Sequence, residues 1–344
     1  MKSTNKKTNI KTNIKKIQRT ILLLSVLIVA LAIGIISLIV IRHNKQLDMP
    51  YTYNVDEELY GTHGAEIQMQ KSDAFASELC VSAGNVSHEA IAPPERVKSA
   101  LMDLDNHEVL FAQNIHDKAY PASITKLMTA LVAVKYGNLS DTVTISSSAL
   151  NLEEGSTETG LQAGDQATLD ELLHALLIYS GNDAAMAIAE HVGGTVDQFV
   201  SMMNEEAYQL GATNTHFVNP SGLHDENHYT TVYDIYLMLK EAISSQYLSE
   251  IMTLNVYNFT YTRGEETLIK RLDSTDQYLT KQVTAPKGVT VLGGKTGTTS
   301  DAGSCLALVS QNAYGEYFIS IVLNAPTKAS LYSNMNQLLE QINS

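Results

Sequence analysis

Residues 20–41 form an apolar stretch that constrains the organisation of the chain more than any other segment. None of these 22 residues is ionisable, and most are Ile, Leu or Val. As a helix the stretch would be about 33 Å long, and the hydrocarbon core of a bilayer is about 30 Å thick. The apolar region of a cleavable signal peptide is shorter, about 7–15 residues, and a small-residue cleavage site follows it. The sequence therefore favours an uncleaved transmembrane helix over a signal peptide or a soluble core helix.

Basic residues flank this stretch unequally. Seven precede it, Arg42 and Lys45 follow it, and no acidic residue occurs before Asp48. The positive-inside rule then makes residues 1–19 a cytoplasmic basic tail and places residues 42–344 outside the membrane. We therefore predict a single-pass protein of the cell membrane with an extracellular folded part.

The charge of that folded part argues against a nucleic-acid partner. The whole chain has 23 basic and 37 acidic residues, and nine of the basic ones precede Asp48. The remainder therefore has 14 basic residues against all 37 acidic ones. Binding to nucleic acid requires a basic surface that neutralises phosphates, so we expect no such partner.

The sequence predicts neither a metal site nor a cofactor. Cys80 and Cys305 are far apart and belong to no metal-binding motif, so two unpaired thiols are favoured, although one disulfide remains open. His224 and His228 flank two acidic residues, but their spacing matches no known type of metal site. A structural or solvated role for these histidines is favoured.

The external part divides into a stalk or linker at residues 42–94 and a domain at residues 95–344. The stalk has no sustained hydrophobic periodicity. The domain pattern predicts helices at 121–136, 168–179, 183–192, 195–210, 231–243 and 330–342. It predicts strands at 97–103, 109–113, 255–261, 267–272, 289–296, 305–310 and 317–323. Strands at both ends with helices between them predict an α+β fold, with one sheet built from both ends and flanked by helices.

Three short elements occur in order within this domain. They are Ser-x-x-Lys at residues 123–126, Ser-x-Asn at 180–182 and Lys-Thr-Gly at 295–297. The first two are weak signals alone, since Ser-x-x-Lys also occurs at residues 3–6 of the tail. Their order and context are more specific: the first is expected to open a helix, the second to lie between two helices, and the third to end an apolar strand.

This spacing suits a serine nucleophile with a lysine base. Residues three apart on a helix share a face, so Lys126 can reach the hydroxyl of Ser123. A serine needs a neighbouring base, and a lysine can be one only if burial or a nearby cation such as Lys295 lowers its pKa. Ser180 is assigned to proton relay towards the leaving group, and Asn182 to orienting a substrate amide.

The third element suits substrate binding. The charge of Lys295 and the hydroxyls of Thr296 and Thr298 match a substrate carboxylate, and the backbone beyond Lys295 can pair with an extended peptide. The N–H groups of Thr298 and Ser123 are expected to form an oxyanion hole. A chance match of helix caps and a turn is the competing interpretation.

These elements resemble those of the low-molecular-weight, serine-type penicillin-binding D-alanyl-D-alanine carboxypeptidases, in which Gly between Ser and Asn is usual. The similar segments are residues 121–130 (PASITKLMTA), 180–185 (SGNDAA), 214–223 (NTHFVNPSGL) and 294–299 (GKTGTT). The likeness covers roughly residues 95–325. It leaves out the further β-rich domain and the carboxy-terminal amphipathic anchor that many relatives have.

The resemblance implies an antiparallel sheet flanked by helices, like that of serine β-lactamases and transpeptidases. It implies removal of the terminal D-alanine of peptidoglycan stem peptides and covalent capture by β-lactams. Ser123 would be the acyl-ester nucleophile, Lys126 its base and Ser180 the third catalytic residue, and Lys295 would bind substrate. Residues 95–344 would then be a catalytic D,D-peptidase domain.

Three alternatives remain open from the sequence. A β-lactamase would need a device for fast deacylation, and no Glu-x-x-Leu-Asn occurs between Asn182 and Lys295, which argues against class A only. A D,D-transpeptidase or endopeptidase would use the same residues. A catalytically silent β-lactam-binding or peptide-binding module would keep the fold without turnover.

Overall fold

A computed structural model describes residues 76–153 and 156–343 of the chain. The predicted tail, the predicted transmembrane helix and residues 42–75 of the predicted stalk lie outside these ranges. No helix inside them is long and apolar enough to cross a membrane. The later part of the predicted stalk contacts the sheet, because Val86 forms a β-bridge with Ala112 and Cys80 is fully buried.

An antiparallel sheet of five strands is built from both ends of the domain, as the sequence predicts. Its strand order is β2-β1-β9-β8-β7. These strands are β2 (Glu108–Gln113), β1 (Lys98–Asp103), β9 (Tyr317–Ala325), β8 (Gly303–Gln311) and β7 (Thr290–Thr299). Strand β7 forms one edge of the sheet.

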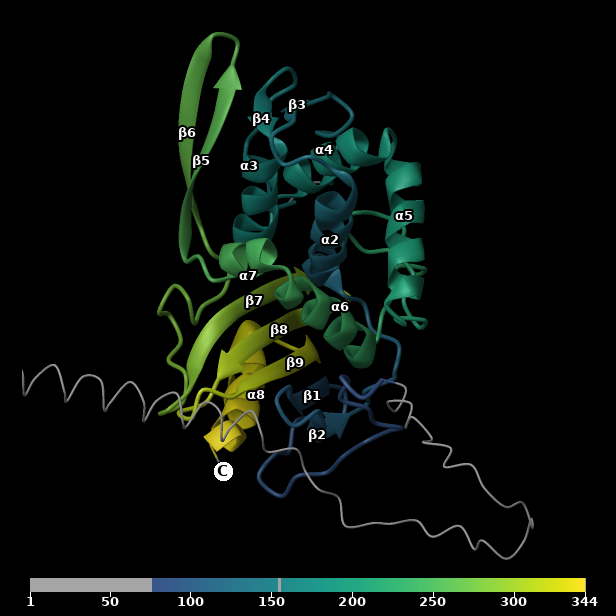
Figure 1. Cartoon of the computed structure of the whole chain (residues 1–344), viewed down its shortest axis with the longest axis vertical. Coiled ribbons are helices and arrows are strands. Elements are labelled where there is room, and N and C mark those ends of the chain that lie inside the picture. Colours follow the sequence, from purple (N-terminus) through teal and green to yellow (C-terminus); the bar gives the residue numbers. More distant parts are fainter. Residues whose placement is uncertain (1–75, 154–155, 344) are drawn as a thin grey trace, which may run out of the picture. The chain divides into compact units, whose positions relative to one another are not determined.

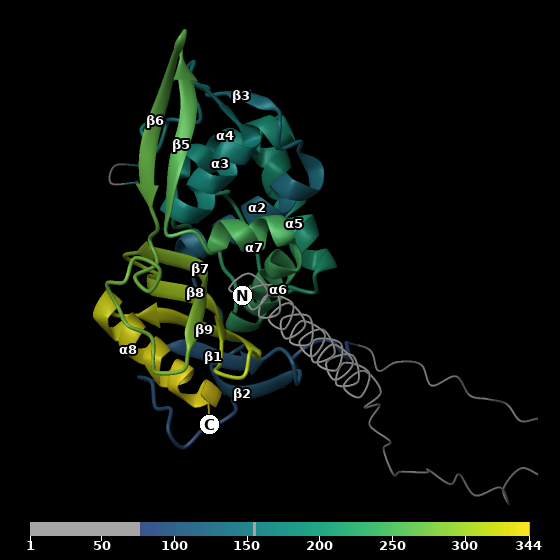
Figure 2. The same cartoon turned by 60° about the vertical axis from the view of Figure 1, so that its left-hand side comes forward.

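Helices cover both faces of this sheet. Helix α8 (Lys328–Leu339), which the 3₁₀ turn η3 (Glu340–Asn343) follows, packs on one face. Helices α6 (Val232–Ser244) and α7 (Gln246–Met252) lie over the other face (Figures 1 and 2). Because alternate side chains of a strand point to opposite faces, each face contributes to its own apolar cluster. The α+β class predicted from the sequence is confirmed.

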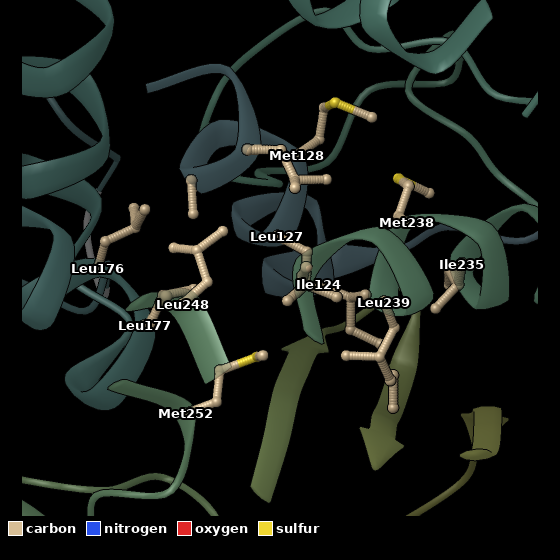
Figure 3. Close-up of a cluster of buried hydrophobic side chains, with 14 of the residues drawn as sticks. Ile124, Leu127, Met128, Leu176, Leu177, Ile235, Met238, Leu239, Leu248 and Met252 are labelled. Carbon is tan, nitrogen blue, oxygen red and sulfur yellow. The ribbon is translucent and has the colours of Figure 1, made fainter. Parts of the chain in front are cut away.

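Helix α2 (Lys126–Tyr136) lies at the centre of the helical part. It packs against α4 (Asn182–Gly193), α5 (Val196–Gln209) and α6. Its first eight residues are all buried, so it is enclosed by protein at the end that carries Lys126. Figure 3 shows the apolar side chains around this end, with Ile124, Leu127 and Met128 beside residues of α6 and α7. The core therefore holds the start of α2 rigidly.

A second sheet stands beside α3 (Leu169–His174). It has the order β3-β4-β5-β6, in which β3 (Thr142–Thr144) and β4 (Gln166–Thr168) have only three residues each. The predicted hairpin is present as β5 (Val256–Arg263) and β6 (Glu266–Asp273), and Figure 1 shows it extending away from the five-stranded sheet. The sequence predicted one sheet and did not show that this hairpin joins another.

Candidate active site

Ser123 lies at the end of α2 that the core encloses. It belongs to the 3₁₀ turn η1 (Ala122–Thr125), and Lys126 is the first residue of the α-helix that follows. The sequence predicted an α-helix that already includes Ser123, and the tighter turn corrects this. The predicted pairing is present, because Lys126 Nζ donates a hydrogen bond of 2.9 Å to Ser123 Oγ.

Lys126 is fully buried and contacts two further acceptors. Its Nζ donates to Asn182 Oδ1 at 2.7 Å and to the backbone oxygen of Ser221 at 2.7 Å. Burial lowers the pKa of Lys126 well below its usual range, and the nearby charge of Lys295 lowers it further, whereas Asp183 opposes the shift. This environment favours the neutral amine, the form that can accept a proton from a serine hydroxyl.

Ser180 takes its place through an unusual backbone. It follows the π-helical turn η2 (Ala175–Tyr179) and has a left-handed conformation with φ of 67°. The next residue is Gly181, and a Cβ there would lie 2.7 Å from Cγ2 of Thr159. A side chain at this position would have to displace the methyl group of Thr159, so the close approach favours Gly in the middle of the second element.

Lys295 lies within strand β7 and reaches the second element. Its Nζ donates to Ser180 Oγ at 2.9 Å and to the backbone oxygen of Thr296 at 3.1 Å. Burial lowers the pKa of Lys295 to about 7, although the charge of Asp276 opposes this shift. The strand was predicted to end at Thr296, but β7 pairs with β8 as far as Thr299.

A cleft brings the three elements together. Ser123, Ser180, Thr296 and Thr298 line it, while Lys126 and Lys295 are buried and bond the two serines. Gly297 of the third element also lines the cleft. Seven further residues line it without a functional signal in the sequence: Thr157, Thr275, Gln277, Cys305, Lys328, Leu331 and Tyr332. They come from segments that meet only in the folded chain.

Asn182 stands beside Lys126 as the first residue of α4. Its Oδ1 accepts from the lysine, and its backbone N–H donates to the oxygen of Thr157 at 2.7 Å. Its side-chain nitrogen bonds no residue that the structure describes. This orientation leaves an amide donor for a ligand, as the prediction for Asn182 requires.

Strand β7 also passes close to η1, the turn that carries Ser123. A Cβ at Gly297 would lie 3.0 Å from the backbone nitrogen of Ser123 and 2.9 Å from the oxygen of Pro121. A side chain there would displace one of the two segments. Glycine therefore permits the N–H of Ser123 and the strand end at Thr298 to approach one another.

A turn at Gly222 packs against the 3₁₀ turn that carries Ser123. Gly222 has φ of +88°, and a Cβ there would lie 1.9 Å from the backbone oxygen of Ala122. The preceding residue, Ser221, supplies an acceptor for Lys126. The only sequence signal for this support is the resemblance of residues 214–223, to which the sequence alone assigned no role.

We expect Gly222→Ala to destabilise the protein by about 2–4 kcal/mol, since it adds backbone strain to a collision with fixed backbone. Thermal denaturation measures this effect. Gly164→Ala is the matched control, because Gly164 has φ of +90° but nothing within 4 Å of its Cβ position. The control should cost only about 1 kcal/mol. Equal losses in the two variants would show that Ala122 yields without cost.

His228 is a buried structural residue. Its Nδ1 accepts from the backbone N–H of Val218 at 3.2 Å, so the proton lies on Nε2, which bonds Thr125 Oγ1 at 2.8 Å. Burial lowers the pKa of His228 to about 4, which keeps the ring neutral. His224 lies edge-on to Tyr120.

Neither cysteine forms a disulfide. Cys80 and Cys305 are free and buried, so the prediction of two unpaired thiols is confirmed. Residues 76–153 and 156–343 contain no group of three or more His, Cys, Asp or Glu side chains placed to hold a metal ion.

A family model described as D-alanyl-D-alanine carboxypeptidase matches residues 88–327. The chain is 32% identical over 273 residues to the D-alanyl-D-alanine carboxypeptidase DacF of Bacillus subtilis, a match that covers 78% of this chain and 65% of DacF. It is 32% identical over 278 residues to DacA of Haemophilus influenzae, with 77% and 68% covered. The chain thus spans about two thirds of the length of these relatives.

Solved structures show the same fold. A D-alanyl-D-alanine carboxypeptidase of Mycobacterium tuberculosis superposes with a TM-score of 0.65 at 26% identity, covering 75% of this chain and 93% of that one. The DD-transpeptidase of Streptomyces K15 gives a TM-score of 0.66 at 24% identity, covering 73% and 98%. The transpeptidase-like fold expected from the sequence is confirmed.

Proposed function

The chain belongs to the D-alanyl-D-alanine carboxypeptidase family, and we propose that it removes the terminal D-alanine of peptidoglycan stem peptides through an acyl ester on Ser123. The contact between Lys126 Nζ and Ser123 Oγ carries this proposal, because it joins a hydroxyl in a cleft to an amine whose charged form burial disfavours. A serine hydroxyl becomes nucleophilic when such a base takes its proton.

Acylation begins when neutral Lys126 accepts the proton of Ser123. The oxygen attacks the carbonyl carbon of the penultimate D-alanine, and the negative charge develops on the carbonyl oxygen. The N–H groups of Ser123 and Thr298 are assigned to that oxygen, and the close approach at Gly297 supports this assignment.

Departure of D-alanine requires a proton on its nitrogen. Ser180 Oγ accepts from Lys295 and can donate its own proton into the cleft, so we assign Ser180 to this relay. Water then attacks the acyl ester and gives a proton to Ser180, which restores the proton lost to D-alanine. Lys126 returns its proton to the oxygen of Ser123 as the ester breaks. Ser123, Lys126 and Ser180 are thus the proposed catalytic residues.

Substrate recognition is assigned to Asn182 and to strand β7. The free side-chain nitrogen of Asn182 is directed to a peptide carbonyl, and β7 offers its unpaired edge to an extended peptide. Lys295, Thr296 and Thr298 are assigned to the terminal carboxylate. Thr296 is already held by Thr275, whose Oγ1 lies 2.5 Å from Thr296 Oγ1.

Two partners follow from the same site and from the sequence. A β-lactam presents a carbonyl and a carboxylate like those of the peptide, so we propose that it acylates Ser123 and remains bound. Residues 20–41 are proposed to anchor the enzyme in the cell membrane with the cleft outside.

Two measurements on the full chain test the function. The first follows release of D-alanine from a peptide that ends in D-Ala-D-Ala. The second locates a penicillin adduct by mass spectrometry of proteolytic fragments. We expect catalytic release and a stable adduct on residue 123. Fast turnover of the penicillin would indicate a β-lactamase instead, and a stable adduct without D-alanine release would indicate a silent binding module.

A further inference from the structure

The buried carboxyl group of Asp276 lies near Lys295 but takes no direct part in the proposed reaction. Asp276 is only 2% exposed. Its Oδ1 accepts from the backbone N–H of Tyr278 at 2.9 Å, whereas its Oδ2 is buried and has no hydrogen-bond partner in the described structure. Burying an unpartnered carboxyl oxygen costs free energy unless an opposite charge compensates.

The chain around Asp276 is fixed to both catalytic elements. The preceding residue, Thr275, donates its backbone N–H to the oxygen of Ile178, two residues before Ser180. The Thr275 hydroxyl meets that of Thr296, the residue after Lys295. Asp276 is therefore held between the two segments that carry the Lys295–Ser180 hydrogen bond.

Four buried ionisable groups lie around the cleft. Lys126 and Lys295 are fully buried, and each has one buried carboxyl group acting on it; the charge of Lys295 also disfavours the charged form of Lys126. For Lys126 this group is Asp183, which accepts from Thr159 and the N–H of Gly160. For Lys295 it is Asp276. Two lysines can share a dry site only if negative charge compensates them.

We propose that Asp276 is a positioning residue that acts through Lys295: its buried carboxylate, held between the second and third elements, keeps the Lys295 ammonium charged and directed at Ser180. This inference rests on the proposed function, since the charge of Lys295 serves substrate binding and the relay through Ser180.

The titratable groups that face Asp276 come from three segments. Lys295 faces it from β7 and Tyr332 from α8, and Tyr278 lies on its own segment. Burial raises the pKa of Asp276 to about 6, and the charge of Lys295 opposes the rise. Burial also raises the pKa values of both tyrosines, so they stay neutral. Above about pH 6, Asp276 is therefore the negative partner of Lys295.

The test compares Asp276→Asn with Asp273→Asn in the full chain. Asp273→Asn is the control. It also removes one negative charge, but the Asp273 side chain is 60% exposed and pairs with Arg271 at the surface. NMR of ¹³C-labelled lysine follows the titration of Lys295, whose resonance is identified by its absence in Lys295→Arg. We expect the Lys295 midpoint to fall by about one pH unit in Asp276→Asn and to stay in place in Asp273→Asn.

Activity gives a second readout. Because Lys295 would lose its proton at lower pH, the alkaline limb of kcat/KM for D-alanine release should move down by about one unit in Asp276→Asn, a loss of about tenfold above the limb. A residue that only supports the fold would lower the rate without moving the limb. Asp276→Glu keeps the charge and should retain the wild-type limb.

The outcomes separate the two proposals. Equal Lys295 midpoints in Asp276→Asn and Asp273→Asn would overturn the role of Asp276. If the wild-type protein releases no D-alanine but the Lys295 midpoint still falls in Asp276→Asn, the link between Asp276 and Lys295 is supported and the proposed function is overturned. If Asp276→Asn does not fold, Asp276→Ser removes the same charge with a smaller side chain, and the same midpoint decides.

Discussion

Ser123→Ala is expected to abolish D-alanine release, with a loss of at least about 10⁵-fold, because no other hydroxyl can take the place of a missing nucleophile. Ser180 is the only other serine that lines the described cleft, and its Oγ accepts from Lys295 at 2.9 Å, not from Lys126, the proposed base. The penicillin adduct should disappear together with the peptide reaction. Both readouts must fail in parallel, since both are assigned to the same oxygen.

The fold should survive this change. Lys126 loses one acceptor but keeps Asn182 Oδ1 and the backbone oxygen of Ser221. The free energy of unfolding should therefore change by no more than about 1 kcal/mol. Ser201→Ala is the matched control, because Ser201 is an exposed serine on α5 whose hydroxyl bonds only the backbone oxygen of Asp197. If Ser123→Ala still released D-alanine, or still bound penicillin covalently, the nucleophile would have to lie elsewhere.

Local sequence rules predicted most of the elements. Helices α5 and α6 begin within one residue of the predicted starts, after threonines that cap them, since Thr195 Oγ1 accepts from Gln198 N–H and Thr231 Oγ1 from Asp234 N–H. A cap of this kind depends on residues three apart, so the sequence alone reveals it. The central sheet could also be predicted, because its strands alternate or are apolar and come from both ends of the domain.

Local rules failed where distant residues compete for the same groups. Thr168 caps α3, since its Oγ1 accepts from the N–H of Glu171, but the carboxylate of Glu171 accepts from the backbone of Thr260 on β5 and does not return to the cap. The predicted continuous helix over 168–179 ends as a π-helical turn, which places Ser180 in its left-handed conformation. Helix α7 was missed, since its seven residues are too few for a clear period.

In the site too, local spacing could be predicted from the sequence, whereas contacts between distant residues could not. The three-residue spacing of Ser123 and Lys126 and the need for a second cation were visible in the sequence. The structure shows the hydrogen bond between Lys126 and Ser123, and it places the charge of Lys295 near Lys126. The hydrogen bond from Lys295 to Ser180 joins residues 115 positions apart in the sequence, so no local pattern could reveal it. The same holds for Asp276, whose significance depends on the absence of a partner for one oxygen.

Replacing Lys126 tests whether the lysine is a base or only a positive charge. Lys126→Met removes the amine, and we expect acylation by the peptide and by penicillin to slow by about 10²–10⁴-fold, the range for a lost general base. Lys126→Arg keeps a positive charge, but a guanidinium cannot give up its proton near neutral pH. The arginine variant should therefore be as inactive as the methionine variant. The measurement is the rate of acyl-enzyme formation by stopped flow.

The control lies on the same helix. Lys135 is in the last turn of α2, with a side chain 43% exposed and its Nζ 2.6 Å from Glu206 Oε2. Lys135→Met changes the charge of α2 by the same amount, far from Ser123, and should leave the acylation rate unchanged. Substantial activity in Lys126→Arg would contradict the role of Lys126 as the base, because only its charge would then matter. The proton of Ser123 would in that case have to leave through Ser180, and Ser180→Ala would become the variant with the larger loss.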